Sequence, residues 1–313
     1  MPRPSLRALT VLIALLSFGG CATAKAPTRP RIALVMKSLA NEFFKTMEDG
    51  ARAHQQANAA RYDLMTSGIK DEQDVAGQIR LVEQMVAEGV QALVIAPADS
   101  KALVATCKRA QDQGLVVVNI DNRLDALIVR ERGLRAPFVG PDNRKGARLV
   151  GEAVARRLQK GDKVAILGGV PGAFNAIARS AGFEDAARSA GLVVAASQSA
   201  FWDTGQANQI AAALVRETPD LKALLCANDN MALGAAAARK AAGKEDSVRI
   251  VGFDNISAVA ELVKARKVVA TADQHAGELA VFGIEYALEA LQTKTPPADR
   301  ETPVDLVTAE GPS

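Results

Sequence analysis

The chain has 313 residues, of which 49% are hydrophobic, 23% charged and 4% aromatic, so it is long enough for two globular domains of common size. Its 38 basic and 35 acidic residues are mixed along the sequence and give a formal net charge of +3. Because no run of Lys and Arg suited to tracking phosphates is present, the charge pattern argues against a nucleic-acid partner.

The first 24 residues are typical of an export signal. Arg3 and Arg7 precede an apolar stretch at residues 8–18, and small residues follow it. Two cleavage sites fit, because Phe18-Gly19-Gly20-Cys21 is similar to a lipoprotein box and Ala22-Thr23-Ala24 suits ordinary signal peptidase. The apolar stretch is short for a membrane span. We therefore expect an exported, periplasmic protein, either soluble or anchored by a lipid on Cys21.

From residue 31 onward, short aliphatic runs alternate with longer amphipathic stretches, the pattern of βα units that build parallel sheets. The amphipathic stretches show helical spacing, for example at Val75, Ile79 and Val82. Both halves of the chain have the same rhythm, which predicts an α/β fold of two doubly wound parallel-sheet lobes. The runs predicted to be strands are residues 32–36, 62–66, 92–95, 116–120, 164–167, 193–196, 223–226 and 250–253.

Polar side chains follow several of these runs at the point where each predicted strand ends. Because the carboxyl ends of parallel strands open into a crevice where strand order reverses, these residues are candidates for a shared cleft. The alternative is local, since Asn and Asp often cap helices and form turns. Recurrence at the same place in both halves favours the cleft. The residues are Ser38, Asn41, Asp121, Asn122, Arg123, Asn228, Asp229, Asn230, Asp254 and Asn255.

The sequence contains few groups suited to catalysis. Cys107 and Cys226 lie in or beside apolar runs, which predicts buried thiols and neither a disulfide framework nor a metal motif. His54 and His275 have no evident nucleophile partner, and Pro171 interrupts the one glycine-rich turn. We therefore predict a protein that is not an enzyme and needs no cofactor or metal.

The aromatic residues point to sugar binding. A sugar offers C–H faces for stacking and hydroxyls that both donate and accept hydrogen bonds. Phe43-Phe44 follows the first predicted strand and Phe201-Trp202 the sixth, at the expected edge of the cleft. The alternative is that all four cover helix N-termini as hydrophobic lids.

Several motifs occur in an order that resembles the ribose-binding protein group of periplasmic binding proteins, which is also similar to the effector domain of lac-repressor regulators. They are KSLANEFF at 37–44, CANDNMALGA at 226–235, VGFDN at 251–255 and PVDL at 303–306. The resemblance spans nearly the whole mature chain. It implies a type I fold whose lobes are joined by a three-strand hinge, with residues 31–140 plus 275–304 in one lobe and 141–274 plus 305–313 in the other.

The resemblance also implies a ligand pocket. Phe43 and Phe44 match the aromatics that cover the sugar ring, Asp121 matches the Asp that binds sugar hydroxyls, and Trp202 takes the place of a stacking Phe. The other matching positions are Asn41, Arg179, Asn228, Asp254 and Gln274.

This chain departs from the family's pattern at Asn122, where ribose binders carry Arg, with Arg123 one place on. We count Asn122 as ligand-binding and expect a neutral amide there to favour a solute whose every oxygen is a hydroxyl. That solute would be a sugar alcohol or a ring sugar other than ribopyranose, with polyols ahead. About six extra residues precede Pro137.

Together these features predict the solute-binding component of an ABC importer, a monomer that captures a small neutral sugar or sugar alcohol, a pentose or polyol, and presents it to an inner-membrane ABC permease. A regulator's sensing domain would need a DNA-binding segment where the export signal lies. Two further alternatives stay open: a binding protein that serves a chemoreceptor or sensor kinase, and a sugar-processing enzyme.

Overall fold

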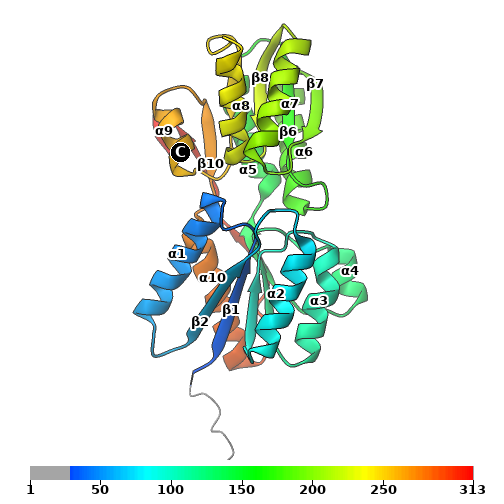
Figure 1. The fold of residues 1–313 in the computed structure, drawn as a ribbon, viewed down its shortest axis with the longest axis vertical. Coiled ribbons are helices and arrows are strands. Elements are labelled where there is room, and N and C mark those ends of the chain that lie inside the picture. The colour runs from blue at the N-terminus through cyan, green and yellow to red at the C-terminus, as the bar shows by residue number, and fades with distance from the viewer. Residues whose placement is uncertain (1–28, 313) are drawn as a thin grey trace, which may run out of the picture.

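The structure is a computed structural model that describes residues 29–312, so the predicted export signal and Cys21 lie outside the described residues. The chain forms two lobes stacked along the long axis of the molecule, each with a sheet between helices (Figure 1). The predicted α/β architecture of two doubly wound lobes is confirmed. Within residues 29–312, no helix combines the length and apolar character needed to cross a membrane.

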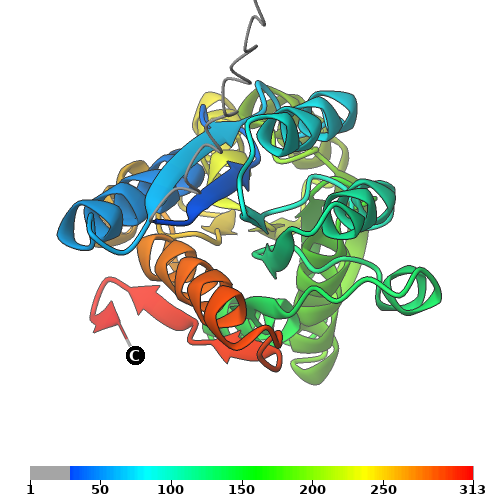
Figure 2. The same ribbon diagram turned by 90° about the horizontal axis from the view of Figure 1, so that it is seen from below.

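The first lobe, called the N lobe here, has a parallel sheet in the order β11-β5-β4-β3-β1-β2. Helices α1 and α10 pack on one face of this sheet, and α2 and α3 cover the other (Figure 2). Its strands are β1 (Arg31–Met36), β2 (Asp63–Gly68), β3 (Ala92–Ile95), β4 (Val116–Ile120), β5 (Phe138–Pro141) and β11 (Arg300–Thr302). Its helices are α1 (Glu42–Ala57), α2 (Val75–Ala87), α3 (Ala102–Asp112), α4 (Ala126–Glu131) and α10 (Ala276–Thr293).

The second lobe, the C lobe, has a sheet in the order β13-β12-β10-β9-β8-β6-β7, in which β12 is antiparallel to β10 and β13. Its strands are β6 (Lys163–Gly168), β7 (Val193–Ser199), β8 (Leu221–Cys226), β9 (Arg249–Val251), β10 (Ala270–Asp273), β12 (Asp305–Thr308) and β13 (Gly311–Pro312). Its helices are α5 (Asn143–Ala155), α6 (Phe174–Ser189), α7 (Thr204–Glu217), α8 (Asp229–Ala241) and α9 (Ser257–Lys264).

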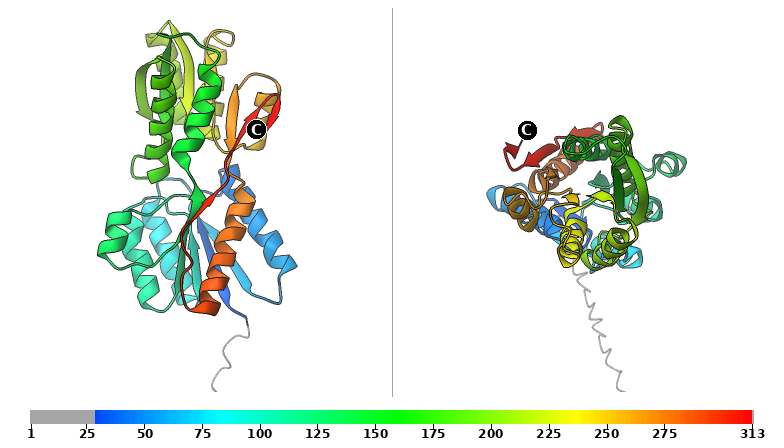
Figure 3. Two further views of the ribbon diagram at one scale, coloured as in Figure 1. Left: turned by 180° about the vertical axis from the view of Figure 1, so that it is seen from behind. Right: turned by 90° about the horizontal axis from the view of Figure 1, so that it is seen from above.

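The chain passes between the two sheets at three places. It does so from β5 to α5, from β10 to α10 and from β11 to β12, and the last passage is visible from behind in Figure 3. Residues that follow the carboxyl ends of β1, β4 and β8 line the space between the lobes.

Every aliphatic run predicted to be a strand contributes to one of the two sheets. Strands such as β1, β3 and β8 are buried on both faces, which requires aliphatic runs, whereas β7 is an edge strand whose Val193 is 45% exposed. The strands that the sequence did not indicate are short ones without an aliphatic run, namely β5, β10, β11, β12 and β13. Helix α4, whose Leu127 is 60% exposed, ends at Glu131, just ahead of the stretch before Pro137. Both Cys107 and Cys226 are free and buried, as predicted, and burial raises the pKa of the Cys107 thiol to about 12.

Candidate ligand-binding site

A cavity of about 240 Å³ lies between the lobes at the carboxyl ends of the strands. All the predicted site residues except Asn122 line it; their binding role stays a prediction. Lys37, Glu72 and Asn175 also line it and were not predicted. The lining residues are Lys37, Asn41, Phe43, Phe44, Glu72, Asp121, Asn175, Arg179, Trp202, Asn228, Asp254 and Gln274.

The N-lobe wall of the cavity carries a buried ion pair. Lys37 follows the last residue of β1 and Asp121 the last residue of β4, so the parallel sheet brings the two side chains together. Their charged atoms, Lys37 Nζ and Asp121 Oδ2, lie 3.1 Å apart, and the side chains are 3% and 2% exposed. Lys37 begins the KSLANEFF motif, so its place directly after a strand was a signal that sequence reasoning overlooked.

Asn41 both caps a helix and lines the cavity. Its Oδ1 accepts a hydrogen bond from the backbone N–H of Phe43 at 3.1 Å, which begins α1, and its Nδ2 donates to Glu72 Oε1 at 3.3 Å. Asn228 is similar, because its Oδ1 accepts from the N–H of Met231 at 2.9 Å at the start of α8. Asn41 and Asn228 thus each cap a helix and also line the cavity.

Glu72 lies in the loop between β2 and α2, where the only sequence signal was a polar run after the second predicted strand. Burial raises the pKa of the Glu72 carboxyl to about 6, although the ammonium group of Lys37 opposes the shift. This carboxyl group is ionised at neutral pH and can accept hydrogen bonds from a solute.

The C-lobe wall is built around Arg179, which is 2% exposed. Its Nε donates to Asn143 Oδ1 at 2.7 Å, and its Nη1 donates to the carbonyl oxygen of Ala227 at 2.9 Å. The same Nη1 lies 3.3 Å from Asp254 Oδ1, which also accepts from Gln274 Nε2 at 2.7 Å. These contacts hold the guanidinium group in one orientation.

Burial also shifts the ionisation of this pair. It raises the pKa of Asp254 well above its ordinary value and lowers the pKa of Arg179, while the attraction between the two opposes both shifts. Hydrogen bonds from a solute to Asp254 would stabilise its charged form.

Three buried acceptors in the cavity wall lack partners. Asp121 Oδ2, Asn175 Oδ1 and Gln274 Oε1 have no hydrogen-bond partner among residues 29–312. For Asp121, the ammonium of Lys37 is close but not aligned for a hydrogen bond. An unpaired buried polar group costs roughly 1–3 kcal/mol, so these oxygens are suited to a solute that supplies donors.

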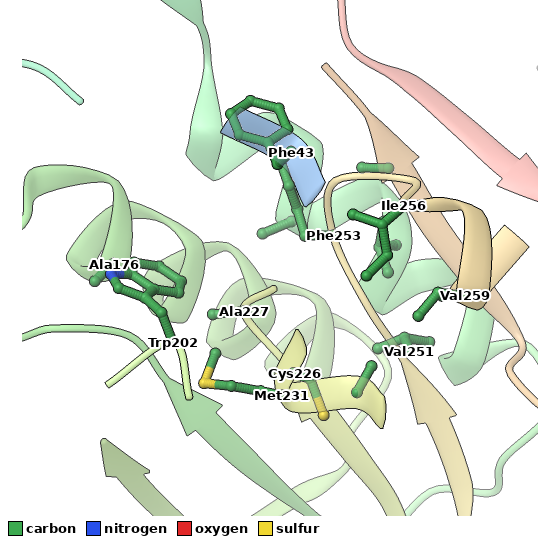
Figure 4. Packing of buried hydrophobic residues seen from close by; sticks show 14 of the residues in the cluster. Phe43, Ala176, Trp202, Cys226, Ala227, Met231, Val251, Phe253, Ile256 and Val259 are labelled. Atoms are coloured by element: carbon green, nitrogen blue, oxygen red, sulfur yellow. The ribbon is translucent and has the colours of Figure 1, made fainter. Parts of the chain in front are cut away.

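Aromatic rings from both lobes complete the wall, and Phe43, Trp202 and Phe253 belong to one packed cluster (Figure 4). Phe43 and Phe44 lie in the first turn of α1 rather than in the turn before it, with ring centroids 5.1 Å apart and an edge-to-face angle of 82°. Phe201 does not line this cavity but lines a neighbouring hollow, to which Trp202 also contributes.

Trp202 has a positive φ of 66°, an unusual backbone conformation for a bulky residue. Its indole lies directly against the backbone of Gly169, where a Cβ would come within 2.0 Å of the ring. The glycine after β6 therefore makes room for the indole.

The structure does not bring Asn122 into the cavity. Its side chain is fully buried, with Nδ2 donating to the carbonyl oxygen of Pro97 at 2.8 Å and Oδ1 accepting from the N–H of Asn175 at 3.1 Å. Asp121 has φ 60°, and Asn122, the next residue, lies in the contact between the lobes. Arg123 points elsewhere, pairing with Asp299 at 2.7 Å.

Comparison with known proteins gives a consistent result. The family described as "periplasmic binding protein domain" matches residues 32–295. A D-ribose/D-allose-binding protein of Pseudomonas aeruginosa is 56% identical over 290 residues, 91% of each chain.

Solved structures agree with this match. A solute-binding protein of an ABC transporter from Burkholderia multivorans, with an unknown ligand interpreted as α-D-erythrofuranose, has a TM-score of 0.88 and 55% identity, covering 90% of this chain and 99% of its own. Another, from Actinobacillus succinogenes with bound D-allose, has a TM-score of 0.85 and 33% identity, covering 90% and 98%.

Proposed function

This chain belongs to the periplasmic binding protein domain family, and on that premise we propose that it captures a small neutral sugar between its lobes for uptake by an ABC importer. No bond is made or broken in this role.

The main support for the proposal is that the cavity wall contains hydrogen-bond acceptors without a partner next to donors that are held in place. A sugar hydroxyl donates one hydrogen bond and accepts others. Hydroxyls could donate to Asp121 Oδ2, Asn175 Oδ1 and Gln274 Oε1. Arg179 and Lys37, held in place by their own contacts, could donate to the hydroxyl oxygens.

Charge and size support a small neutral solute. Lys37 faces Asp121 and Arg179 faces Asp254, so both cations of the cavity wall already have a carboxylate partner and neither is left to pair with an anionic solute. Glu72 adds a further acceptor for hydroxyl groups. The cavity is small and its wall is mostly polar, which suits a small polyhydroxylated solute better than a large apolar ligand.

Among small sugars, we propose a ring sugar, a pentose or hexose. The rings of Phe43, Phe44 and Trp202 suit the C–H faces of such a ring. The relatives whose names and bound ligands include ribose and allose favour the same class. The expectation of a polyol depended on Asn122, and it loses that basis because Asn122 lies outside the cavity.

The proposed mechanism is closure around the solute. A sugar that contacts both walls has differential affinity for the closed arrangement and therefore shifts the lobes toward it, with the three chain passages as the hinge. An affinity near micromolar corresponds to about −8 kcal/mol after ordering costs. Export through residues 1–24 and delivery to an inner-membrane permease complete the proposal, and docking on a chemoreceptor or sensor kinase stays a prediction from sequence.

Calorimetry with D-ribose, D-allose, other pentoses and hexoses, and four- to six-carbon polyols tests the proposal. We expect at least one ring sugar to bind near micromolar affinity and to be recovered chemically unchanged. If only polyols bind, the ligand class is polyols and the proposal of a ring sugar is wrong. Conversion of a sugar, or no binding by any member of the panel, would contradict the proposed function.

A further inference from the structure

Two helices of the C lobe begin without a capping side chain of their own. Helix α6 begins after Ala173 and helix α9 after Ile256, and neither residue has a side chain that can accept a hydrogen bond. Other helices of the same lobe are capped by their own residues, for example α7 by Asp203 and α8 by Asn228. The first N–H groups of any helix need an acceptor from outside the helix.

For α6 the acceptors come from the N lobe. Ser100 Oγ accepts from the N–H of Phe174 at 2.9 Å, and Asn122 Oδ1 accepts from the N–H of Asn175 at 3.1 Å. The backbone N–H of Ser100 also donates to the carbonyl oxygen of Gly172 at 3.0 Å. The side chains of Ser100 and Asn122, both in the N lobe, thus act as the N-cap of α6.

For α9 the acceptor is Glu42, at the start of α1 in the N lobe. Its Oε1 accepts from the N–H of Ser257 at 2.8 Å, and its Oε2 accepts from the Ser257 hydroxyl at 3.0 Å. A carboxylate at this position also interacts favourably with the partial positive charge of a helix N-terminus.

We propose that the N lobe caps α6 and α9 in trans, so that Ser100, Asn122 and Glu42 stabilise the closed arrangement of the lobes without contacting the solute. The inference rests on the proposed closure mechanism and extends it. When the lobes separate, the first N–H groups of both helices exchange these acceptors for water. The three side chains therefore set the closed fraction and, through it, the apparent affinity for sugar.

One of the two contacts is also linked to the cavity. Asn175 receives the cap from Asn122 through its backbone N–H, while its own side chain lines the cavity with Oδ1 unpaired. A solute hydroxyl that donates to Asn175 Oδ1 would therefore hold the first turn of α6 where Ser100 and Asn122 can cap it. This gives Asn122 a function that its position next to Asp121 does not suggest.

Disulfide trapping measures the closed fraction without any sugar. A Cβ built on Gly172 would lie 4.0 Å from the Cβ of Asp99 in the other lobe, within the range that disulfides need. The double variant Asp99→Cys and Gly172→Cys, with Cys21→Ser to remove a competing thiol, should therefore cross-link only when the lobes close. Its oxidation rate reports the closed population even where that population is small.

In this background we expect Glu42→Ala to slow cross-linking by about 2- to 30-fold, the range for loss of a helix cap. Ser257→Ala removes only one of the two bonds and should slow it less. The matched control is Asp74→Ala, because Asp74 Oδ1 caps α2 within the N lobe by accepting from the N–H of Gly77 at 2.7 Å. This control should lower thermal stability and leave the cross-linking rate unchanged.

An unchanged rate in folded Glu42→Ala and Ser257→Ala variants would overturn the inference, as would equal slowing by Asp74→Ala. Calorimetry then shows whether the apparent dissociation constant for a sugar that binds rises by the same factor in Glu42→Ala. If no sugar binds the parent protein, the proposed function fails while the trapping result still decides the capping inference.

Discussion

Lys37 Nζ and Asp121 Oδ2 lie 3.1 Å apart in the wall of the interlobe cavity, with side chains that are 3% and 2% exposed. The two residues are distant in sequence and meet because each directly follows a central strand of the N-lobe sheet. Removal of one partner leaves the other as an uncompensated buried charge, whereas an exposed pair contributes little.

We therefore expect Lys37→Met to lower the free energy of unfolding by about 3–5 kcal/mol, measured by chemical denaturation. The control is Lys163→Met, because Lys163 pairs with Asp220 at 2.9 Å while the side chains are 42% and 60% exposed. That change should cost less than about 1 kcal/mol. Equal losses in the two variants would show that burial of the Lys37 pair has no energetic consequence.

Arg179→Ala should weaken sugar binding by about 1.5–3 kcal/mol, because a buried charged donor to the solute is lost. Arg239 is a matched control, since it is also buried but donates to the carbonyl oxygens of Val248 and Lys267, away from the cavity. Arg239→Ala should reduce stability and leave the affinity measured by calorimetry unchanged. If both variants lose affinity equally, the effect of Arg179 is one of folding rather than recognition.

The pH dependence of sugar binding should follow Glu72. Its pKa of about 6 means that the carboxyl group is protonated, and a poorer acceptor, in more acidic solution. Affinity should be constant above about pH 7 and fall by up to about tenfold per pH unit below pH 6. Glu72→Gln should remove this dependence, and Asp71→Asn, at the exposed neighbouring residue, should keep it.

The same raised pKa has a consequence for stability. Since burial disfavours the ionised form, the contribution of Glu72 to the free energy of unfolding should decrease as pH rises from about 4.5 to about 6 and then level off. Denaturation of Glu72→Gln across this range, compared with the parent protein, measures that contribution. An identical pH profile in the two proteins would mean that Glu72 titrates normally.

Trp202 is the only tryptophan of the chain, so its fluorescence reports on the cavity directly. We expect its emission to change on sugar binding. Gly169→Ala should displace the indole and weaken binding, because the added Cβ would lie 2.0 Å from the ring. Gly168→Ala is the control, since its nearest atom, Ser180 Oγ, is at 3.4 Å. Similar effects of the two variants would argue against a specific role of Gly169.

Much of this protein follows from its sequence alone. Aliphatic runs determine the strands because a parallel sheet covered on both faces must be apolar throughout, and polar residues after those runs identify the cleft because parallel strands end at one edge. Asp121, Asn228 and Asp254 were found in this way, and Arg179 through the family resemblance. The short strands β5 and β10 to β13 were not predicted, because their pairing depends on neighbours distant in sequence.

Only the tertiary structure decided what each polar side chain faces. Asp121 and Asn122 are adjacent in sequence, yet the positive φ of Asp121 accompanies a turn after which one side chain lines the cavity and the other caps a helix of the opposite lobe. Lys37 and Glu72 belong to the cavity because the N-lobe sheet and the loop after β2 bring them there. The direction in which a side chain points, and the groups it contacts, depend on backbone dihedrals and on residues far along the chain. Residue type and spacing could therefore indicate the cleft but not the role of each residue within it.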